Sequence, residues 1–167
     1  MSPLVTSRRG SRIIIFWLFA GLVVLLDQAT KAAVRYVAPS TGFMRVLIPG
    51  LIDLVHVENT GAAFSIGEGA GPLFALLALV VACAAYVFVC TQEPPLPLTA
   101  SIACVVGGGL GNMFDRLMHG SVTDFIATSF IDFPVFNVAD IAVTCGIFLS
   151  FVLYLMWEGR ASEEAGR

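Results

Sequence analysis

Ile13 to Leu26 reads IIIFWLFAGLVVLL, an apolar stretch broken only by Gly21. Beyond a few polar residues the apolar character continues to about Val34. A helix needs about 20 apolar residues to cross a bilayer, so this stretch predicts a transmembrane helix over about 13–34. Basic residues precede it, as in a signal peptide, but it is long for one and no small-x-small cleavage site ends it. We therefore expect a retained helix.

Three further apolar stretches are long enough to span a membrane, over about 72–90, 97–114 and 138–157. The 167 residues are 57% hydrophobic and 13% charged, with a mean hydropathy of +0.89. Soluble domains average about 25% charged residues, so the composition is that of a membrane protein. No internal repeat or linker divides the chain, and we expect one integral-membrane domain over 1–167.

The basic residues predict the orientation of these helices. The cluster before the first helix favours a cytoplasmic N-terminus, and four crossings then place both termini in the cytoplasm. The segments of about 35–71 and 115–137 would face the extracytoplasmic side. The first of these contains Met44 to Leu47 and Leu51 to Val57, which are rich in β-branched and aliphatic residues typical of strands. The expected fold is an all-α membrane protein, with four transmembrane helices and a small extracytoplasmic β-like platform.

Several kinds of chemistry are disfavoured by what the sequence lacks. The formal net charge of −3 comes without a basic patch, which argues against a nucleic-acid partner. The four cysteines form no C-x-x-C pair and lie near no histidine cluster, so neither a disulfide framework nor a zinc site is expected. We expect no metal and no organic cofactor.

Two short segments each place an aspartate at the edge of an apolar stretch. One reads SVTDFI over 121–126 and carries Asp124; the other reads FNVADIA over 136–142 and carries Asp140. Carboxylates at a membrane helix are costly and mark functional sites. Two carboxyl groups that meet in a low-dielectric site cannot both ionise easily, so the pair can act as acid and base on a water molecule. Asp140 alone could also be a first-turn residue that faces the helix dipole.

Asp27 and Lys31 are four apart and share one helix face. One interpretation is an intrahelical ion pair with a lysine that snorkels to the membrane surface. The other is that the pair contacts the loops that build the site.

Two further motifs carry polar residues among small ones. Asn59 lies in ENTGAAFS over 58–65, which is either an ordinary re-entrant turn or a segment whose amide binds substrate or orients a catalytic carboxyl. GGGLGNMFDR over 107–116 contains Gly108, whose small size permits close helix packing. Packing does not explain Asn112 and Arg116, which we expect to join a polar network with the aspartates. Asn137, three residues before Asp140, would belong to the same network.

Other proteolytic chemistries leave no trace in the sequence. It contains no H-E-x-x-H and no G-x-S-G, and Gly109-Leu110-Gly111 is followed by asparagine rather than the aspartate of a G-x-G-D motif. Two alternatives from other classes remain. A small transporter or channel subunit also carries intramembrane carboxylates, although near the midplane. A scaffold protein without chemistry is the third.

These blocks, in this order, resemble lipoprotein signal peptidase (signal peptidase II), a family of bacterial inner-membrane aspartic proteases. The blocks are DQATK over 27–31, NTGAAFS over 59–65, GNMFDR over 111–116, VTDFI over 122–126 and FNVAD over 136–140. The resemblance implies that Asp124 and Asp140 are the catalytic pair. It implies supporting roles for Asp27, Lys31, Asn59, Asn112, Arg116 and Asn137. We also expect a supporting role for Gly108, which lies three residues before the GNMFDR block.

The resemblance also implies a substrate and a location. The substrate would be a prolipoprotein whose cysteine carries diacylglycerol, and the enzyme would cut directly before that cysteine. Membrane lipid and inhibitors of the globomycin type are the other expected partners. The protein would be a multi-pass protein of the cytoplasmic membrane with its active site towards the extracytoplasmic side.

Overall fold

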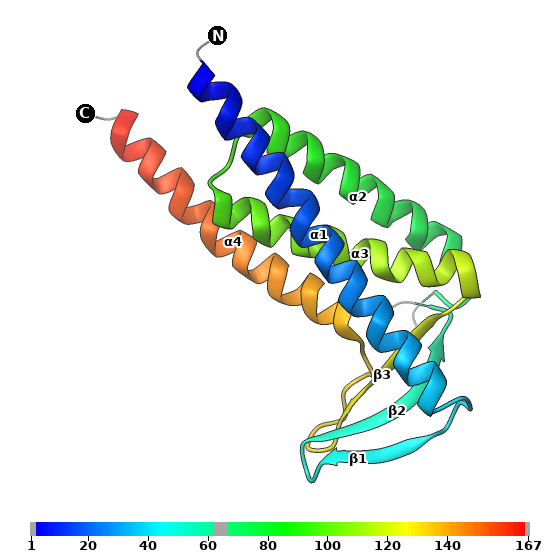
Figure 1. Cartoon of the computed structure of the whole chain (residues 1–167). Helices are drawn as coiled ribbons and strands as arrows, with labels where there is room; N and C mark the ends of the chain where they lie inside the picture. Colours follow the sequence, from blue (N-terminus) through cyan, green and yellow to red (C-terminus); the bar gives the residue numbers. More distant parts are fainter. Residues whose placement is uncertain (1–2, 62–66, 166–167) are drawn as a thin grey trace.

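The computed structural model of the chain describes residues 3–61 and 67–165, and side chains over 9–61 and 67–160. Four long helices form a bundle, and a three-stranded sheet lies at one end of it (Figure 1). The helices are α1 (Pro3–Val37), α2 (Gly71–Gln92), α3 (Leu96–His119) and α4 (Val138–Ala165). Each contains a stretch long and apolar enough to cross a membrane. The predicted fold class is confirmed.

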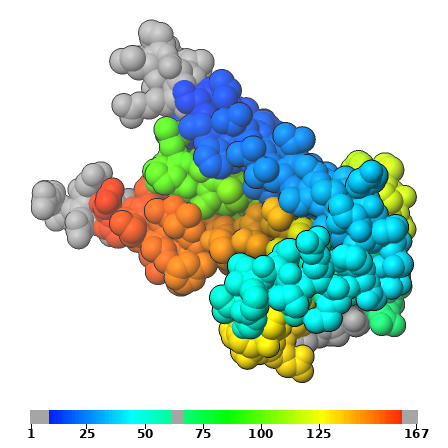
Figure 2. Space-filling view, turned by 60° about the horizontal axis from the view of Figure 1, so that its bottom comes forward, coloured from blue at the N-terminus to red at the C-terminus, as the bar shows by residue number. Residues whose placement is uncertain are grey.

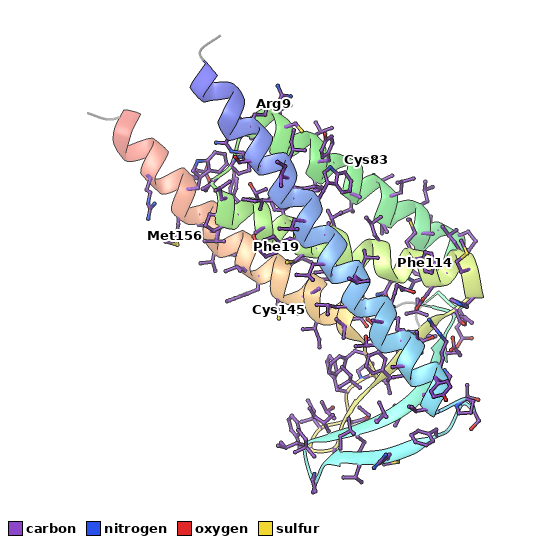
Figure 3. All side chains as sticks on the ribbon, viewed as in Figure 1. Arg9, Phe19, Cys83, Phe114, Cys145 and Met156 are labelled. Atoms are coloured by element: carbon purple, nitrogen blue, oxygen red, sulfur yellow. The ribbon has the colours of Figure 1, made fainter. Side chains whose placement is uncertain are left out.

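Helix α3 is the centre of the bundle. Of its most apolar stretch 44% is buried, compared with 11–17% for the other three helices. The buried apolar core joins α3 to two other helices. It consists of Phe16 and Ala20 from α1, Val89 from α2, and Ala103 and Val106 from α3 itself. The outer surfaces of the helices are apolar too: Met156 projects from the outer edge of α4 (Figure 3), and Phe19 on α1 is also exposed. Apolar side chains facing outward are expected of helices that meet lipid.

The sheet consists of β1 (Met44–Ile48), β2 (Ile52–Asn59) and β3 (Val122–Thr128), in the order β1-β2-β3 and antiparallel throughout. It forms a lobe at the end of the bundle opposite the start of α1 and the end of α4 (Figures 1 and 2). The two strands expected before α2 are therefore present. We call this lobe the platform.

A sharp turn brings β3 back beneath the bundle. Gly120 adopts a φ of +79° at the C-terminus of α3, and its N–H donates to the carbonyl of Arg116. Glycine takes this left-handed conformation at little cost and commonly ends helices in this way. The chain then enters β3 at Val122, which places Asp124 two residues into the strand and next to α3.

Candidate active site

The two aspartates lie on different elements and line the same cavity of about 480 Å³. Asp124 is 3% exposed and comes from β3, whereas Asp140 comes from the first turn of α4. The Asn137 amide joins them: Nδ2 donates to Asp124 Oδ1 at 2.7 Å, and the Asn137 backbone N–H donates to Asp140 Oδ2 at 3.0 Å.

The start of α4 builds this connection through helix capping. Asn137 Oδ1 accepts a hydrogen bond from the Asp140 backbone N–H, while the Asp140 carboxylate accepts one from the Asn137 backbone N–H. This reciprocal arrangement has the geometry of a capping box. Asp140 is thus a first-turn acid that also lines the cavity, so the first-turn interpretation is confirmed, while its catalytic role stays a prediction.

Two more amides hold the carboxylates from the sides. Asn59, the last residue of β2, donates from Nδ2 to Asp124 Oδ2 at 3.0 Å. Asn112 on α3 donates from Nδ2 to Asp140 Oδ1 at 2.8 Å. The pKa of Asp124 is raised to about 6: burial is the largest cause, the nearby charge of Asp140 adds to it, and the hydrogen bonds from Asn59 and Asn137 oppose the rise. Asp124 therefore takes up a proton at a higher pH than an ordinary aspartate does.

Asp27 and Lys31 lie behind this site rather than in it. Lys31 Nζ lies 2.9 Å from Asp27 Oδ2 and 2.9 Å from Asp115 Oδ2, and it donates to Asn112 Oδ1 at 2.7 Å. The intrahelical ion pair is confirmed, but the snorkelling lysine is wrong, because Lys31 is 0% exposed and points into the protein. Asp27 Oδ1 accepts the backbone N–H of Ala139 at 3.1 Å, so the pair does contact the site through α4.

Arg116 contacts the backbone rather than the aspartates. Nη2 donates to the carbonyl of Gly61 at 2.8 Å, Nη1 donates to the carbonyl of Asn112 at 3.3 Å, and the guanidinium stacks on Phe74. Among residues 9–61 and 67–160, no ion pair joins Arg116 to Asp124 or Asp140. It fixes the chain just after Asn59.

The glycines of α3 set the distances between helices. A Cβ at Gly107 would lie 2.6 Å from the carbonyl of Ala20 on α1, and one at Gly108 would collide with the backbone of Ala139 on α4. A Cβ at Gly111 would lie 2.6 Å from Asp27 Oδ2. Gly108 does not line the cavity and supports the site by letting α4 approach.

The rest of the cavity is largely apolar. The side chains of Val122, Phe133, Val135, Phe136, Ile141 and Val143 line it beside the polar groups. Residues 62–65 of the ENTGAAFS segment lie outside the described part of the chain.

Sequence reasoning missed a group of residues beside Asp124. The Glu58 carboxylate is hydrogen-bonded to His56, Ser121 and Thr123. Arg35 in turn donates to Thr123 Oγ1 at 2.9 Å. One signal could have found part of this group: His56 and Glu58 are two apart in a strand, so they share a face.

Fold and site together define a multi-pass membrane protein in which two aspartates line one cavity at one end of a four-helix bundle. A family model described as signal peptidase (SPase) II matches residues 19–156. The chain belongs to the signal peptidase II family, and is therefore a peptidase and a multi-pass bacterial membrane protein. This membership favours the peptidase interpretation over the transporter and scaffold alternatives.

Individual relatives agree with the family. The lipoprotein signal peptidase of Parasynechococcus marenigrum is 43% identical over 149 residues, which cover 88% of this chain and 91% of the relative. That of Enterococcus faecalis is 32% identical and covers 91% of this chain and 94% of its own length. A bacterial membrane enzyme solved by the in meso method superposes with a TM-score of 0.77 at 31% identity, covering 88% of each chain. A second such structure gives 0.75 at 32% identity, over 87% of this chain and 93% of that one.

Proposed function

We propose that this chain is an aspartic endopeptidase that removes the signal peptide from prolipoproteins by cutting directly before a cysteine that carries diacylglycerol. The observation that carries the proposal is the cavity, in which Asp124 and Asp140 meet beside an apolar wall. The relatives named lipoprotein signal peptidase support the same substrate class.

The chemistry follows from one proton shared by two carboxyl groups. Asp124 holds the proton, because it is buried and its pKa is raised to about 6. Asp140 takes a proton from water as the water oxygen attacks the scissile carbonyl, and Asp124 gives its proton to the carbonyl oxygen. When the tetrahedral intermediate collapses, the C–N bond breaks, Asp140 returns a proton to the leaving amine and Asp124 regains its own.

The apolar wall explains why the substrate carries lipid. The scissile peptide requires water and carboxylates, whereas the diacylglyceryl group close to it requires a hydrocarbon environment. Each buried methylene contributes about 0.8 kcal/mol, so the acyl chains anchor the substrate more strongly than the peptide can. Membrane lipid is then both the surrounding solvent and the route of entry.

The proposed orientation places both termini in the cytoplasm and the platform on the extracytoplasmic side. The basic residues before the first span favour this, and the platform lies at the end of the bundle opposite the start of α1 (Figure 1). The site then lies where a translocated lipoprotein precursor is anchored.

The test compares lipidated and unlipidated precursor in the same detergent micelles, with and without globomycin. We expect cleavage of the lipidated form, which globomycin inhibits by occupying the cavity, and little cleavage of the unlipidated form. Equal cleavage rates for both precursors would show that the lipid does not contribute to substrate recognition. Cleavage that a zinc chelator abolishes would contradict the aspartic mechanism.

A further inference from the structure

A second polar cluster lies beside Asp124, centred on the Glu58 carboxylate. Glu58 Oε1 accepts a hydrogen bond from Thr123 Oγ1 at 3.1 Å, and Oε2 accepts one from Ser121 Oγ. Thr123 directly precedes Asp124, and Glu58 directly precedes Asn59, whose amide donates to Asp124. The hydrogen bond between Glu58 and Thr123 therefore joins the two residues that directly precede Asn59 and Asp124, and so helps to position the hydrogen bond between those two side chains.

The His56 ring holds the other side of this carboxylate. Nδ1 faces the carbonyl of Ala38 just beyond α1, and Nε2 lies 2.8 Å from Glu58 Oε1. A carbonyl oxygen and an ionised carboxylate only accept hydrogen bonds, so both ring nitrogens must carry protons. Burial alone would raise the pKa of Glu58, but hydrogen bonds from Ser121, His56 and Thr123 lower it, which keeps this carboxyl ionised. His56, 6% exposed, is then an imidazolium.

The backbone alone does not fix the alignment of the strands here. Leu54 pairs with Ile126 and Val57 pairs with Asp124, so β2 has one more residue than β3 between these pairs. A bulge of this kind disrupts the ladder locally and bends the strand. His56 lies within this irregular stretch and Glu58 lies just after it. Their side-chain contacts hold β2 where the ladder is interrupted.

The cluster also connects to the charged residues inside the bundle. The Thr123 hydroxyl donates to Glu58 and accepts from Arg35 Nη1 at 2.9 Å. The Arg35 guanidinium lies 3.7 Å from Asp115 Oδ1, and Asp115 pairs with Lys31. The platform is thus tied to α1 at two points, through Ala38 and through Arg35.

We propose that His56 and Glu58 form a charged positioning pair that clamps β2 after its bulge, so that the Asn59 amide points at Asp124 Oδ2. This inference rests on the proposed function, because it treats Asp124 as a reacting group. The pair acts through its neighbours Asn59 and Thr123. Its loss should lower turnover more than it weakens substrate binding.

A matched control separates positioning from general stabilisation of the sheet. Asp53 is the other carboxylate on β2; it is buried and accepts a hydrogen bond from Ser129 Oγ just beyond β3 at 2.8 Å. It lies at the far end of the strand, opposite Ala127, and does not line the cavity. Asp53→Ala therefore breaks a comparable contact away from Asp124.

The activity experiment is a double-mutant cycle on lipidated precursor. We expect Glu58→Ala to lower kcat about tenfold with KM nearly unchanged, Glu58→Gln to lie between this and wild type, and Asp53→Ala to retain kcat while lowering Tm. In an Asn59→Ala background, Glu58→Ala should have less than about a twofold effect, because the group it positions is gone. Additive effects, or an equal loss of kcat in Asp53→Ala, would overturn the proposal.

Two NMR measurements test the pair without relying on activity. The chain has two histidines, so a His119→Gln background leaves His56 alone. Both of its ¹⁵N ring signals should be those of protonated nitrogens at pH 7, and Glu58→Gln should leave only Nδ1 protonated. The Asn59 side-chain amide signal should shift in Glu58→Ala and not in Asp53→Ala.

A neutral His56 in the wild-type protein, or an Asn59 signal that does not respond to Glu58→Ala, would overturn the inference. Failure of the proposed function would look different: wild-type protein would not cleave lipidated precursor, while the NMR signals would still report on the pair.

Discussion

Two pairs of carboxylates in the described part of the chain have different partners. Asp27 and Asp115 share the Lys31 ammonium, which lies 2.9 Å from each. Asp124 and Asp140 are held by amides and backbone N–H groups, and in the described part of the chain neither forms an ion pair with a cation. One pair is neutralised by a fixed charge, whereas the other is only hydrogen-bonded.

We propose that this difference separates structural carboxylates from reactive ones. The Lys31 ammonium lies between Asp27 and Asp115 and offsets the charge of both, so the three groups form a buried ion-pair cluster. Amide donors orient a carboxylate without supplying a charge, and two such carboxylates can share a proton and exchange it with substrate. The same residue type therefore performs different work because of the partner the fold provides.

The largest expected effect is the loss of cleavage activity when either aspartate of the proposed catalytic pair is replaced. Asp124→Asn and Asp140→Asn keep the side-chain shape but cannot transfer a proton, so each should lower cleavage of lipidated precursor by about 10²–10⁴-fold. Circular dichroism and elution of the detergent-solubilised protein should match wild type. Activity above roughly a tenth of wild type in either variant would argue against the dyad.

The Lys31 ammonium, which Asp27 and Asp115 share, should stabilise the folded protein. Lys31→Met leaves two carboxylates buried without their shared ammonium, and breaking a buried ion pair in this way costs about 3–5 kcal/mol. Thermal unfolding in detergent measures the loss. Adding Asp27→Asn and Asp115→Asn to Lys31→Met should restore much of it, because no uncompensated charge then remains. A Lys31→Met protein as stable as wild type would show that the ammonium is dispensable.

The Asp124 carboxyl should make the free energy of unfolding depend on pH. The pKa of Asp124 is about 6 in the folded protein and 3.8 as its ordinary value, so the folded state binds the proton more tightly. Its stabilising contribution is complete below about pH 4 and is lost as pH rises through about 6. The loss relative to Asp124→Asn should reach about 3 kcal/mol. A Tm difference between the two proteins that is constant from pH 4 to 7 would contradict the assignment.

Smaller effects should follow when the orienting groups are removed. Asn112→Ala and Asn137→Ala each leave carboxylate oxygens with fewer donors, and Arg116→Ala releases the carbonyl of Gly61. Each should cost about 1–3 kcal/mol in stability, activity or both. Turnover and melting temperature measured on the same samples separate the two. Wild-type values for all three variants would disprove the network.

The fold could be predicted because a bilayer imposes a length on every spanning helix. The apolar stretches such as Ile13–Leu26 exceed anything that a soluble strand requires. The platform was harder to predict, because the alternation in Leu51–Val57 is imperfect. The structure gives the reason: β2 carries a bulge after Leu54, which interrupts the two-residue period.

Predictability of the site depended on how far apart the partners lie in sequence. Asp124 and Asp140 stand out because carboxylates at apolar edges are rare, although their catalytic role stays a prediction. The direction of the Lys31 side chain depends on Asp115, a residue from another helix, and no local pattern reveals that partner. Glu58 was hard to predict because its hydroxyl partners, Thr123 on β3 and Ser121 just before it, lie far away in the sequence.

The hydrogen bond from the Ala139 backbone to Asp27 has a consequence for biogenesis. The pair of Asp27 and Lys31 lies within one helix, so α1 can enter the membrane with its charges already matched. The remaining Asp27 oxygen meets its donor only when α4, which follows α1, α2 and α3 in the chain, docks against α1 and α3. The same docking brings in Asp140. Under the proposed function, a chain synthesised only as far as α3 lacks half of the catalytic pair, so proteolysis would begin only after α4 has inserted.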